Sequence, residues 1–418
     1  ALIRKGHGTT AMSSGTLDIA GPDKFLPLDS WDDVPHVAER LKEILRTNPL
    51  HPYSIVAGGR NGIHSLCAHM SESFDFLATQ IPQLQMKGSY EKNAAFPSVL
   101  GTVKFSSMAP NSLYYGNLLE MQGAEILLVG ISGLMLFQPR ICRQTLARHS
   151  SLHAPKAIER VEIVEMTIPQ FLNALPSAPF EIARHFDSPR TAEHFAEVLN
   201  NKIPGGISHV ALPPVLGLEN YAEIYDIFSR RIKAHIFELI SPNFSVPGYR
   251  LQQALDAALT KHNIHILNGE VVDAKREGPK VRNLIFRDWK TERTAAAKRY
   301  VLATGKFSAG GLGSDGFPFE PVFRLPVFSR DIRVDNRFIQ DLLSWNVEKE
   351  QLFLSCGIHI DKQLRPVDAS GEVVYENLFA AGSIIGEYDY VADKCGFGVA
   401  VLTGFLAGQQ AALAKGAE

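Results

Sequence analysis

The chain has 418 residues, of which 45% are hydrophobic and 21% are charged, and its formal net charge is −2. This balance is typical of a packed globular protein with two or more domains, not of a disordered chain. The nearly neutral charge gives no basic field for nucleic acid, and no apolar run reaches the roughly 20 residues of a membrane-spanning helix.

The four cysteines are scattered along the chain and include no Cys-x-x-Cys pair; they are Cys67, Cys142, Cys356 and Cys395. This spacing excludes an ordinary cysteine-ligated iron–sulfur cluster and favours a reducing compartment. Burial as inert small side chains is the expected state of most of them. Cys395 stands apart because it lies inside a glycine-rich turn. We expect no metal site.

The first elements are a strand fragment and two helices. Ala1-Leu-Ile is apolar and Arg4-Lys-Gly turns the chain, so we interpret this start as the tail of a second strand. Its preceding strand, glycine-rich turn and helix would then be missing, through a fragment or a late start. Apolar residues at helical spacing predict a helix over 31–48, and a second helix is predicted over 60–81. Strands are predicted over 98–105 and 112–117.

A β-α-β unit is predicted in the middle of the chain, with strands over 125–131 and 160–167 and a helix between them that ends near His149. The turn after its first strand reads Gly130-Ile-Ser-Gly133 and lacks the third glycine of a dinucleotide fingerprint. A structural role is therefore favoured over nucleotide binding here. The later predictions are helices over 190–201, 220–236 and 251–262 and strands over 209–213, 264–267, 271–276, 280–286, 294–297 and 299–305.

Two short motifs indicate where a ligand can approach the backbone. Ser13-Ser14-Gly15 offers hydroxyls and a glycine soon after the first strand. The buried strand at 299–305 ends in Thr304-Gly305, where a side chain larger than glycine would block a close approach. A serine–glycine turn and an ordinary strand end are the simpler explanations of each motif taken alone.

The C-terminal segment is the most specific of the three motifs. Residues 377–381 read as a buried strand that Gly382 ends, and Gly396 and Gly398 open an apolar helix. A helix N-terminus offers N–H groups and partial positive charge, which suit the pyrimidine end of a reduced flavin. The three motifs in this order predict a flavin-binding fold. The expected cofactor-binding residues are Ser13, Ser14, Gly15, Thr304, Gly305, Gly382, Ser383, Gly396, Phe397, Gly398 and Val399.

The sequence gives fewer indications of which residues bind the substrate or accept its proton. Arg250 follows Pro247-Gly at a predicted helix start and is a candidate for binding a phosphate group, with a surface or salt-bridge role as the alternative. His51 and His359 are possible proton acceptors, but a structural role is favoured for both. No catalytic base is assigned.

On these motifs the chain resembles the flavin-dependent oxidoreductases related to succinate dehydrogenase and fumarate reductase. Within them it is similar to the B subunit family of anaerobic glycerol-3-phosphate dehydrogenase. The resemblance implies an α/β, Rossmann-like FAD/NAD(P)-binding fold with three layers and a mostly parallel sheet. The flavin-binding domain is expected over 1–30 and 246–418, and a large inserted α/β domain over 31–245. The segments that carry the resemblance are 12–18, 51–54, 129–135, 249–252, 302–312, 377–383 and 395–398.

The resemblance also implies a function. The family's flavoprotein, with FMN favoured and FAD as the alternative, works with a separate catalytic subunit and with an iron–sulfur membrane-anchor subunit. The complex oxidises sn-glycerol 3-phosphate to dihydroxyacetone phosphate and passes electrons to quinone, with fumarate or nitrate as terminal acceptor. It lies on the cytoplasmic side of the cell membrane as a peripheral protein.

Two alternatives stay open. A non-catalytic scaffold with a degenerate flavin fold would dock the catalytic subunit. Ser383 favours it slightly, because the wider superfamily often has an acidic residue there. The second alternative is an independent flavin dehydrogenase for another hydroxy substrate.

Overall fold

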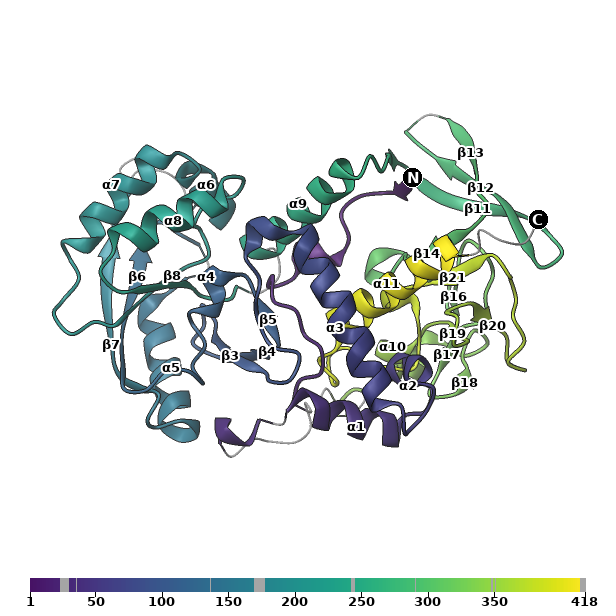
Figure 1. Ribbon diagram of the computed structural model, residues 1–418, viewed down its shortest axis with the longest axis horizontal. Helices are drawn as coiled ribbons and strands as arrows, with labels where there is room; N and C mark the ends of the chain where they lie inside the picture. The colour runs from purple at the N-terminus through teal and green to yellow at the C-terminus, as the bar shows by residue number, and fades with distance from the viewer. Residues whose placement is uncertain are drawn as a thin grey trace.

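Two lobes make up the molecule, and helix α9, Val246–Lys261, runs between them (Figure 1). The computed structural model describes residues 1–22, 30–34, 36–135, 137–168, 177–241, 245–289, 291–346, 349 and 351–413. We call the elements from β3 to β9 the inserted lobe and the remaining elements the terminal lobe.

The inserted lobe is built on a four-stranded parallel sheet in the order β7-β6-β8-β9. Strand β6 is almost completely buried, as the continuous apolar run predicts for a parallel strand covered on both faces. The predicted β-α-β unit is confirmed, since β6 and β7 are parallel and α5 lies between them in the chain. The strands are β6 Ala124–Ile131, β7 Ile158–Met166, β8 His209–Leu212 and β9 His235–Glu238.

Helices and short antiparallel strands complete this lobe. Helix α5 packs against β6 and β7, and α7 packs on α8. The helices are α4 Asn111–Tyr114, α5 Pro139–His153, α6 Pro179–Phe186, α7 Pro189–Asn200 and α8 Tyr221–Arg231. The short strands are β3 Ala94–Pro97, β4 Val103–Ser106 and β5 Met108–Ala109, of which β5 pairs with β2 Lys87–Gly88.

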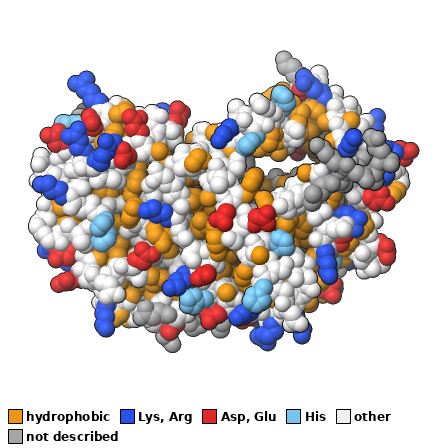
Figure 2. Space-filling view, viewed as in Figure 1, with side chains coloured by type: hydrophobic (Ala, Val, Ile, Leu, Met, Phe, Trp, Pro, Cys, Tyr) orange, Lys and Arg blue, Asp and Glu red, His pale blue; other side chains and the backbone are white. Residues whose placement is uncertain are grey.

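The terminal lobe holds two separate parallel strand pairs. β1 Leu2–Arg4 pairs with β10 Ile266–Asn268, and β14 Tyr300–Leu302 pairs with β21 Leu378–Ala380. No ladder joins the two pairs in the described part of the chain. Figure 2 shows an opening in the molecular surface in this region, and it also shows charges of both signs interspersed over the visible face.

Helices α3 and α11 pack together beside these strands (Figure 1). Helices α1 and α2 pack on α3 as well, so residues 37–80 join the terminal lobe although the predicted inserted domain begins at residue 31. The helices are α1 Val37–Thr47, α2 Pro52–Ala57, α3 Ile63–Gln80, α10 Leu352–Ser355 and α11 Gly396–Leu413. No described helix is long and apolar enough to cross a membrane.

The remaining elements are short. A three-stranded antiparallel sheet is formed by β11 Glu270–Glu277, β12 Lys280–Arg287 and β13 Glu292–Ala296. Two-stranded antiparallel pairs are β15 Gly313–Ser314 with β16 Pro318–Phe319, β17 Phe328–Ser329 with β18 Ile332–Arg333, and β19 His359–Ile360 with β20 Pro366–Val367. The 3-10 turns are Thr9–Met12, Trp31–Asp33, Pro82–Leu84, Phe307–Ala309, Ile339–Leu342 and Gly382–Ile384.

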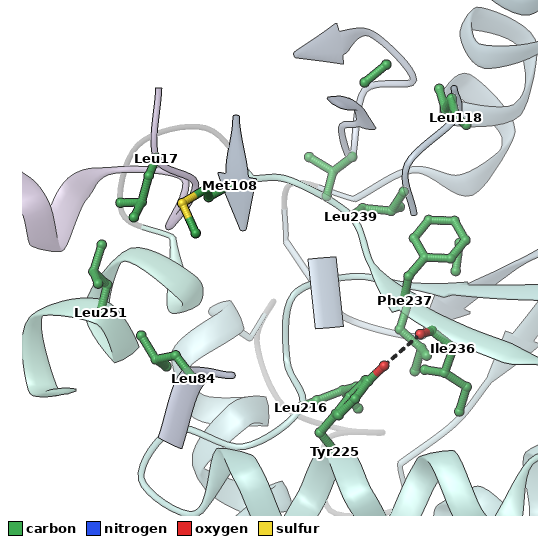
Figure 3. Close-up of a cluster of buried hydrophobic side chains, with 14 of the residues drawn as sticks. Leu17, Leu84, Met108, Leu118, Leu216, Tyr225, Ile236, Phe237, Leu239 and Leu251 are labelled. Atoms are coloured by element: carbon green, nitrogen blue, oxygen red, sulfur yellow. Dashed lines mark hydrogen bonds between the residues drawn. The ribbon is translucent and has the colours of Figure 1, made fainter. Parts of the chain in front are cut away.

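One hydrophobic core is continuous across the two lobes. In Figure 3, Leu17 lies beside Met108, and Leu84 points toward α9, the helix that carries Leu251. The same cluster continues into the inserted lobe through Phe237 and its neighbours, and the Tyr225 hydroxyl donates a hydrogen bond to the Ile236 carbonyl at 3.2 Å. The lobes are therefore joined by packed apolar side chains as well as by the chain itself.

Three sequence predictions are wrong in the inserted lobe. The strand predicted over 98–105 is a hairpin: the chain turns between β3 and β4, where the Gly101 N–H donates to the Ser98 carbonyl at 2.8 Å and Gly101 has a positive φ of +78°. The strand predicted over 112–117 is in fact helix α4, whose Ser112 bonds to Tyr221 and Glu238 across the lobe. These tertiary contacts override the β-propensity of the Leu-Tyr-Tyr run. The helix predicted over 220–236 ends at Arg231, because Ile232 is extended and the chain turns into β9.

Candidate functional site

The ends of β14 and β21 bring four of the predicted site residues together. The strands are paired at Leu302 and Ala380, and the Ala381 N–H donates to the Leu302 carbonyl at 2.9 Å. Gly305 and Gly382 follow with φ values of +78° and +72°, which favour glycine. A Cβ added to Gly305 would lie 2.7 Å from Ala309 Cβ and 3.6 Å from the Ser383 hydroxyl, so one side of Gly305 is already packed within the chain, and Thr304-Gly305 and Gly382-Ser383 are neighbours.

The first half of α11 lies against this pair of strand ends. The Gly382 N–H donates to Thr403 Oγ1 of α11 at 2.8 Å. A Cβ added to Gly382 would meet only Ala400, at 3.8 Å, and one added to Gly396 would meet only Tyr390, at 3.5 Å, within the described structure. Ala400 itself is exposed. Bare backbone and small side chains therefore form an uncovered surface here, against which a flat ligand can lie.

Gly398 and Gly15 have a different role, because protein atoms fill the space beside them. A Cβ at Gly398 would collide with the Tyr53 hydroxyl, and one at Gly15 would lie 2.7 Å from Pro247 Cβ. Tyr53 is fixed there by donating to the Ile19 carbonyl at 2.6 Å. Because these two glycines have no side chain, Tyr53 and Pro247 can pack closely against their backbone.

The Ser13-Ser14-Gly15 segment runs beside the inserted lobe. Ser14 Oγ lies 2.9 Å from Lys104 Nζ of β4, which also donates to Thr16 Oγ1 at 2.8 Å. Ser13 Oγ donates to the Thr10 carbonyl at 2.7 Å, so its hydroxyl serves a local turn. A few residues later in the chain, the Asp18 carbonyl accepts a hydrogen bond from the Gly398 N–H of α11 at 2.7 Å.

Phe397 and Val399 lie in the first turn of α11. The Val399 side chain is fully buried in the main core, and its N–H donates to the Cys395 carbonyl at 2.9 Å. Phe397 is partly buried against the same core. Both side chains therefore pack into the protein, and Val399 can contact a ligand only through its backbone.

The hypothesis that Arg250 binds a substrate phosphate is not supported. Its guanidinium forms a two-pronged pair with the Glu238 carboxylate at 2.7 and 3.1 Å, and Nε donates to the Gly217 carbonyl at 2.7 Å. Both side chains are almost completely buried, and the guanidinium also lies over the Tyr221 ring. Because its donors are used inside the protein, Arg250 links α9 to β9 as a structural residue.

A buried polar cluster lies directly before α11. His51, at the N-cap of α2, accepts the Tyr53 N–H on Nδ1 at 3.0 Å, so the neutral ring carries its proton on Nε2. That nitrogen lies 3.8 Å from Cys395 Sγ. Burial lowers the pKa of His51 to about 3 and raises the pKa of the Cys395 thiol well above its usual value. The ring is therefore neutral and the thiol protonated at neutral pH.

Lys306 follows Gly305 after the end of β14 and lies close enough to His51 to contribute to lowering its pKa. Its ammonium donates to the Leu354 carbonyl at 2.5 Å and to the Tyr388 carbonyl at 3.3 Å, and it lies over the Tyr388 ring. Burial lowers the pKa of Lys306 to about 8. Lys306 thus ties the β14 end to the loop that leads into α11.

Asp393 completes the cluster and is its most accessible member. Its side chain is 26% exposed, and Nη2 of the cation Arg40 lies 3.9 Å away. Burial raises the pKa of Asp393 to about 6, although Arg40 opposes that shift. The sequence patterns did not single out Asp393 or Lys306, because each is one ordinary charge in a loop. Adjacency to the glycine turns was the only available signal.

The cluster does not suit a metal ion well. A nitrogen of His51, an oxygen of Asp393 and Cys395 Sγ all lie within 4.8 Å of one another. However, Nδ1 of His51 is occupied by the Tyr53 N–H, and a metal on Nε2 would need the opposite tautomer. The cations Lys306, Arg330 and Arg40 also lie close enough to His51 to lower its pKa.

The contacts of His359 are those of a structural residue, which is the role that the sequence favours for it. Its Nε2 lies 2.8 Å from a carboxylate oxygen of Glu387, and its ring stacks on Phe328 at 3.8 Å between centroids. Glu387 also accepts the Asp331 N–H. This contact network fixes the turn between β17 and β18 against the loop before α11.

Comparisons with known proteins agree with the geometry. The family model described as FAD binding domain matches residues 1–399. Proteins named as the B subunit of anaerobic glycerol-3-phosphate dehydrogenase are similar over nearly the whole chain. The one from Pasteurella multocida is 26% identical, covering 98% of this chain and 92% of its own length. The one from Haemophilus influenzae strain PittGG is 29% identical, covering 96% and 91%.

A protein from a third organism gives a similar match. A protein of Halobacterium salinarum, named as a probable B subunit of anaerobic glycerol-3-phosphate dehydrogenase, is 26% identical over 98% of this chain and 91% of its own length. The expected resemblance is thus confirmed. The family match supports a flavin cofactor, at the family level FAD, and does not distinguish FMN.

The described residues fit the ring end of such a cofactor. The backbone at Gly382 and Gly396 is uncovered where an added Cβ meets almost nothing, beside the N-terminus of an 18-residue helix. The α/β fold, with its parallel strand pairs and inserted parallel sheet, is of the Rossmann-like kind that was predicted. The chain belongs to the FAD binding domain family.

Proposed function

We propose that this chain is the flavin-binding subunit of an anaerobic glycerol-3-phosphate dehydrogenase. In this proposal the complex oxidises sn-glycerol 3-phosphate to dihydroxyacetone phosphate and passes the electrons to quinone, with fumarate or nitrate as terminal acceptor. The chain works with a separate catalytic subunit and with an iron–sulfur anchor subunit at the cytoplasmic face of the membrane. The names of its relatives and the family match support this assignment.

The observation that carries the proposal is the junction of two glycine-ended strands with a helix N-terminus. Gly305 and Gly382 end neighbouring parallel strands, and Gly382 is bonded to α11 through Thr403. Ligands in open α/β sheets bind at the carboxyl ends of the strands, and this junction lies at such ends. The residues proposed to contact the ring end are Thr304, Gly305, Gly382, Ser383 and Gly396, with a backbone contact from Phe397. The N–H groups of Gly398 and Val399 are already donated to the Asp18 and Cys395 carbonyls, so these two residues support the helix start instead.

A bound flavin supplies a two-electron acceptor for hydride. The chain's own contribution is electrostatic and steric. With a flavin ring at this junction, the N-terminus of α11 would offer partial positive charge to the edge of the ring that gains negative charge on reduction. Ala381, Ala400 and the glycines keep side chains out of the plane that the ring needs. Ser13, Ser14 and Gly15 are proposed to line the far side of the cofactor through their backbone, since the Ser14 hydroxyl is engaged by Lys104.

The second candidate function is a scaffold that docks the catalytic subunit without a cofactor of its own. The observation that favours it is the packing at Gly398 and Gly15, where Tyr53 and Pro247 take the space beside the glycines. Ser383, in place of an acidic residue, would also bind ribityl hydroxyls less strongly.

Counting flavin in the purified complex separates the two candidates. Two flavins per pair of this chain and the catalytic subunit would support the flavin-binding subunit, while one would support the scaffold. Extraction and chromatography of the released cofactor would then identify it as FAD or FMN. Bleaching of both flavins by glycerol 3-phosphate under anaerobic conditions would test the substrate.

A further inference from the structure

Lys306 brings a positive charge into the protein directly after a glycine-ended strand. It follows Gly305 beyond the end of β14, and it is the one buried lysine among the described residues. We propose that the ammonium of Lys306 stabilises the negative charge of a reduced flavin and thereby raises the midpoint potential of that flavin. This inference rests on the proposed function and deepens it, because it names a residue that would tune the bound cofactor.

The ammonium of Lys306 is held in one place. It donates to the Leu354 carbonyl at 2.5 Å and to the Tyr388 carbonyl at 3.3 Å. The carbonyl of Lys306 itself accepts the Ala309 N–H at 3.2 Å and the Gly311 N–H at 3.0 Å, so the backbone is fixed as well. A charge that is fixed in advance stabilises a developing opposite charge without the cost of rearranging the protein.

No anion in contact neutralises this cation. No ion pair joins the ammonium to a carboxylate in the part of the chain that the structure describes. Burial lowers the pKa of Lys306 to about 8, and the carboxylates of Asp389 and Glu387 are among the groups that oppose this shift. However, Glu387 pairs with His359, and Asp389 accepts backbone N–H groups of its own loop. Lys306 is therefore charged at neutral pH without a bonded counter-ion among the described residues.

A tie between two carbonyls does not require a charge. Asn377, immediately before β21, donates from Nδ2 to the Val281 carbonyl at 2.8 Å and to the Lys298 carbonyl at 3.0 Å. A neutral amide thus makes the same kind of tie in the same lobe. Burying a cation costs free energy unless an opposite charge compensates for it. An anionic ligand at the end of β14 would provide that compensation.

The ammonium lies within electrostatic reach of the proposed ring site. Adjacent Cα atoms are about 3.8 Å apart and a lysine side chain extends roughly 6 Å, so Nζ of Lys306 is at most about 10 Å from Gly305 Cα. Cys395, the residue before Gly396, is close enough to Lys306 to affect its pKa. Because the ammonium is buried, solvent and salt screen its field only weakly over such distances. Its charge would add to the partial charge at the start of α11.

The proposed effect needs no bond to Lys306. Hydride transfer brings two electrons and one proton to the ring, which leaves one negative charge there. In the proposed function the electron pair comes from glycerol 3-phosphate. Lys306 keeps its proton throughout, and its ammonium lowers the free energy of the charged reduced state relative to the neutral oxidised state.

The test measures the midpoint potential of the flavin in the purified full-length chain, by equilibration with a reference dye. Lys306→Met removes the charge, and Lys306→Gln removes it but keeps a donor for the two carbonyls. We expect both to favour the oxidised flavin by about tenfold or more, a potential lower by about 30 mV for a two-electron couple. Lys306→Arg keeps the charge and should stay within about threefold of the native ratio.

The matched control is Lys298→Met. Lys298 is exposed and lies just before β14, at the opposite end of the same strand. Removing an exposed charge there should leave the midpoint potential at its native value, because solvent screens it.

Sulfite binding gives a second readout that does not involve turnover. Sulfite adds to an oxidised flavin and leaves a negative charge on the ring, so its dissociation constant reports nearby positive charge. We expect this constant to rise by about tenfold in Lys306→Met and Lys306→Gln and to stay near the native value in Lys306→Arg. If a variant loses flavin during purification, the dissociation constants of added oxidised and reduced flavin give the same free-energy difference as the potential.

Two results would overturn the proposal. A native potential in both Lys306→Met and Lys306→Gln would show that Lys306 only ties the loops together. An equal fall in potential in Lys306→Arg would show that the shape of the side chain matters and its charge does not. A folded native chain that holds no flavin would instead refute the proposed function, and the role of Lys306 with it.

Discussion

Two buried charge clusters in this protein look alike in sequence and differ in structure. Arg250 in the first turns of α9 and Asp393 just before α11 each lie near the start of a long helix. Arg250 meets Glu238 through two hydrogen bonds, and Glu238 also accepts from Ser112 and from the Leu216 N–H. Asp393 has a cation at 3.9 Å and no bonded donor among the described residues.

The difference distinguishes a charged group that holds two elements together from a charged group whose protonation state can change. A buried ion pair with every polar atom satisfied fixes two elements together, and its removal is expected to affect folding. A carboxylate that is half desolvated and under-partnered can change its protonation state at little structural cost. Position near a helix start therefore says less about function than the number of hydrogen bonds that a charged group already makes.

The largest expected effect is on the Arg250 pair. Arg250→Ala leaves the Glu238 carboxylate buried without its partner and should lower the free energy of unfolding by about 3–5 kcal/mol. Arg231→Ala breaks a half-exposed pair with Glu193 and should cost less than about 1 kcal/mol. Urea unfolding of both variants measures the contrast. A stable Arg250→Ala protein with weakened substrate affinity would restore Arg250 as a phosphate-binding residue.

The next effect is the response of His51 to acid. Its pKa is lowered by burial to about 3, so between pH 6.5 and 3 the unfolded chain binds a proton that the folded chain does not. Stability should therefore fall with falling pH in this window, by up to about 1.4 kcal/mol per pH unit. His51→Asn keeps an N-cap acceptor for Tyr53 and should flatten this dependence.

The control for this experiment is exposed His64→Asn, which should leave the dependence unchanged. Asp393 acts in the opposite direction between pH 3.8 and about 6, because its folded-state pKa is raised. Thermal unfolding is therefore measured against pH for the native protein, His51→Asn and His64→Asn, with Asp393 left unchanged in all three. An equally steep acid dependence in His51→Asn would show that His51 is not neutral in the folded protein.

The smallest of the three effects concerns Gly398. A methyl group there meets the Tyr53 hydroxyl and the Ile19 backbone, so Gly398→Ala should destabilise by about 1–3 kcal/mol. Gly408→Ala, where an added Cβ meets nothing within 4 Å in the described structure, should be neutral or stabilising by up to about 1 kcal/mol. Should Gly398→Ala prove harmless, the close packing of Tyr53 on α11 would be contradicted.

Much of the fold was accessible from the sequence. Strands β6, β7 and β8 of the inserted sheet were predictable from their apolar and β-branched residues, and α3 and α11 carry long apolar stretches. Strand β9 was not predicted, because its first residues fall at the end of the helix predicted over 220–236. Helix α4 was not, since only the contacts of Ser112 with distant residues decide its conformation. The packing of residues 37–80 on α11 also depends on contacts far apart in the chain.

The site was accessible only in part. Glycines at strand ends and at a helix start mark places where backbone must be reachable, and the structure brings Gly305 and Gly382 to neighbouring strand ends, while the backbone at Gly396 is also uncovered. The sequence could not tell these from Gly15 and Gly398, which make room for Pro247 and Tyr53. Burial and hydrogen-bond partners, which distinguish Arg250 from Asp393, are properties of the folded chain alone.

The central claim is that this chain binds a flavin at the glycine-ended strands beside α11. The most direct measurement is the visible spectrum of the purified full-length protein, compared with that of Gly382→Val. We expect one flavin per native chain, with absorption near about 370 and 450 nm as is usual for oxidised flavin, and a folded, colourless Gly382→Val protein. A folded native chain without flavin, or a Gly382→Val chain that keeps its full complement, would contradict the claim.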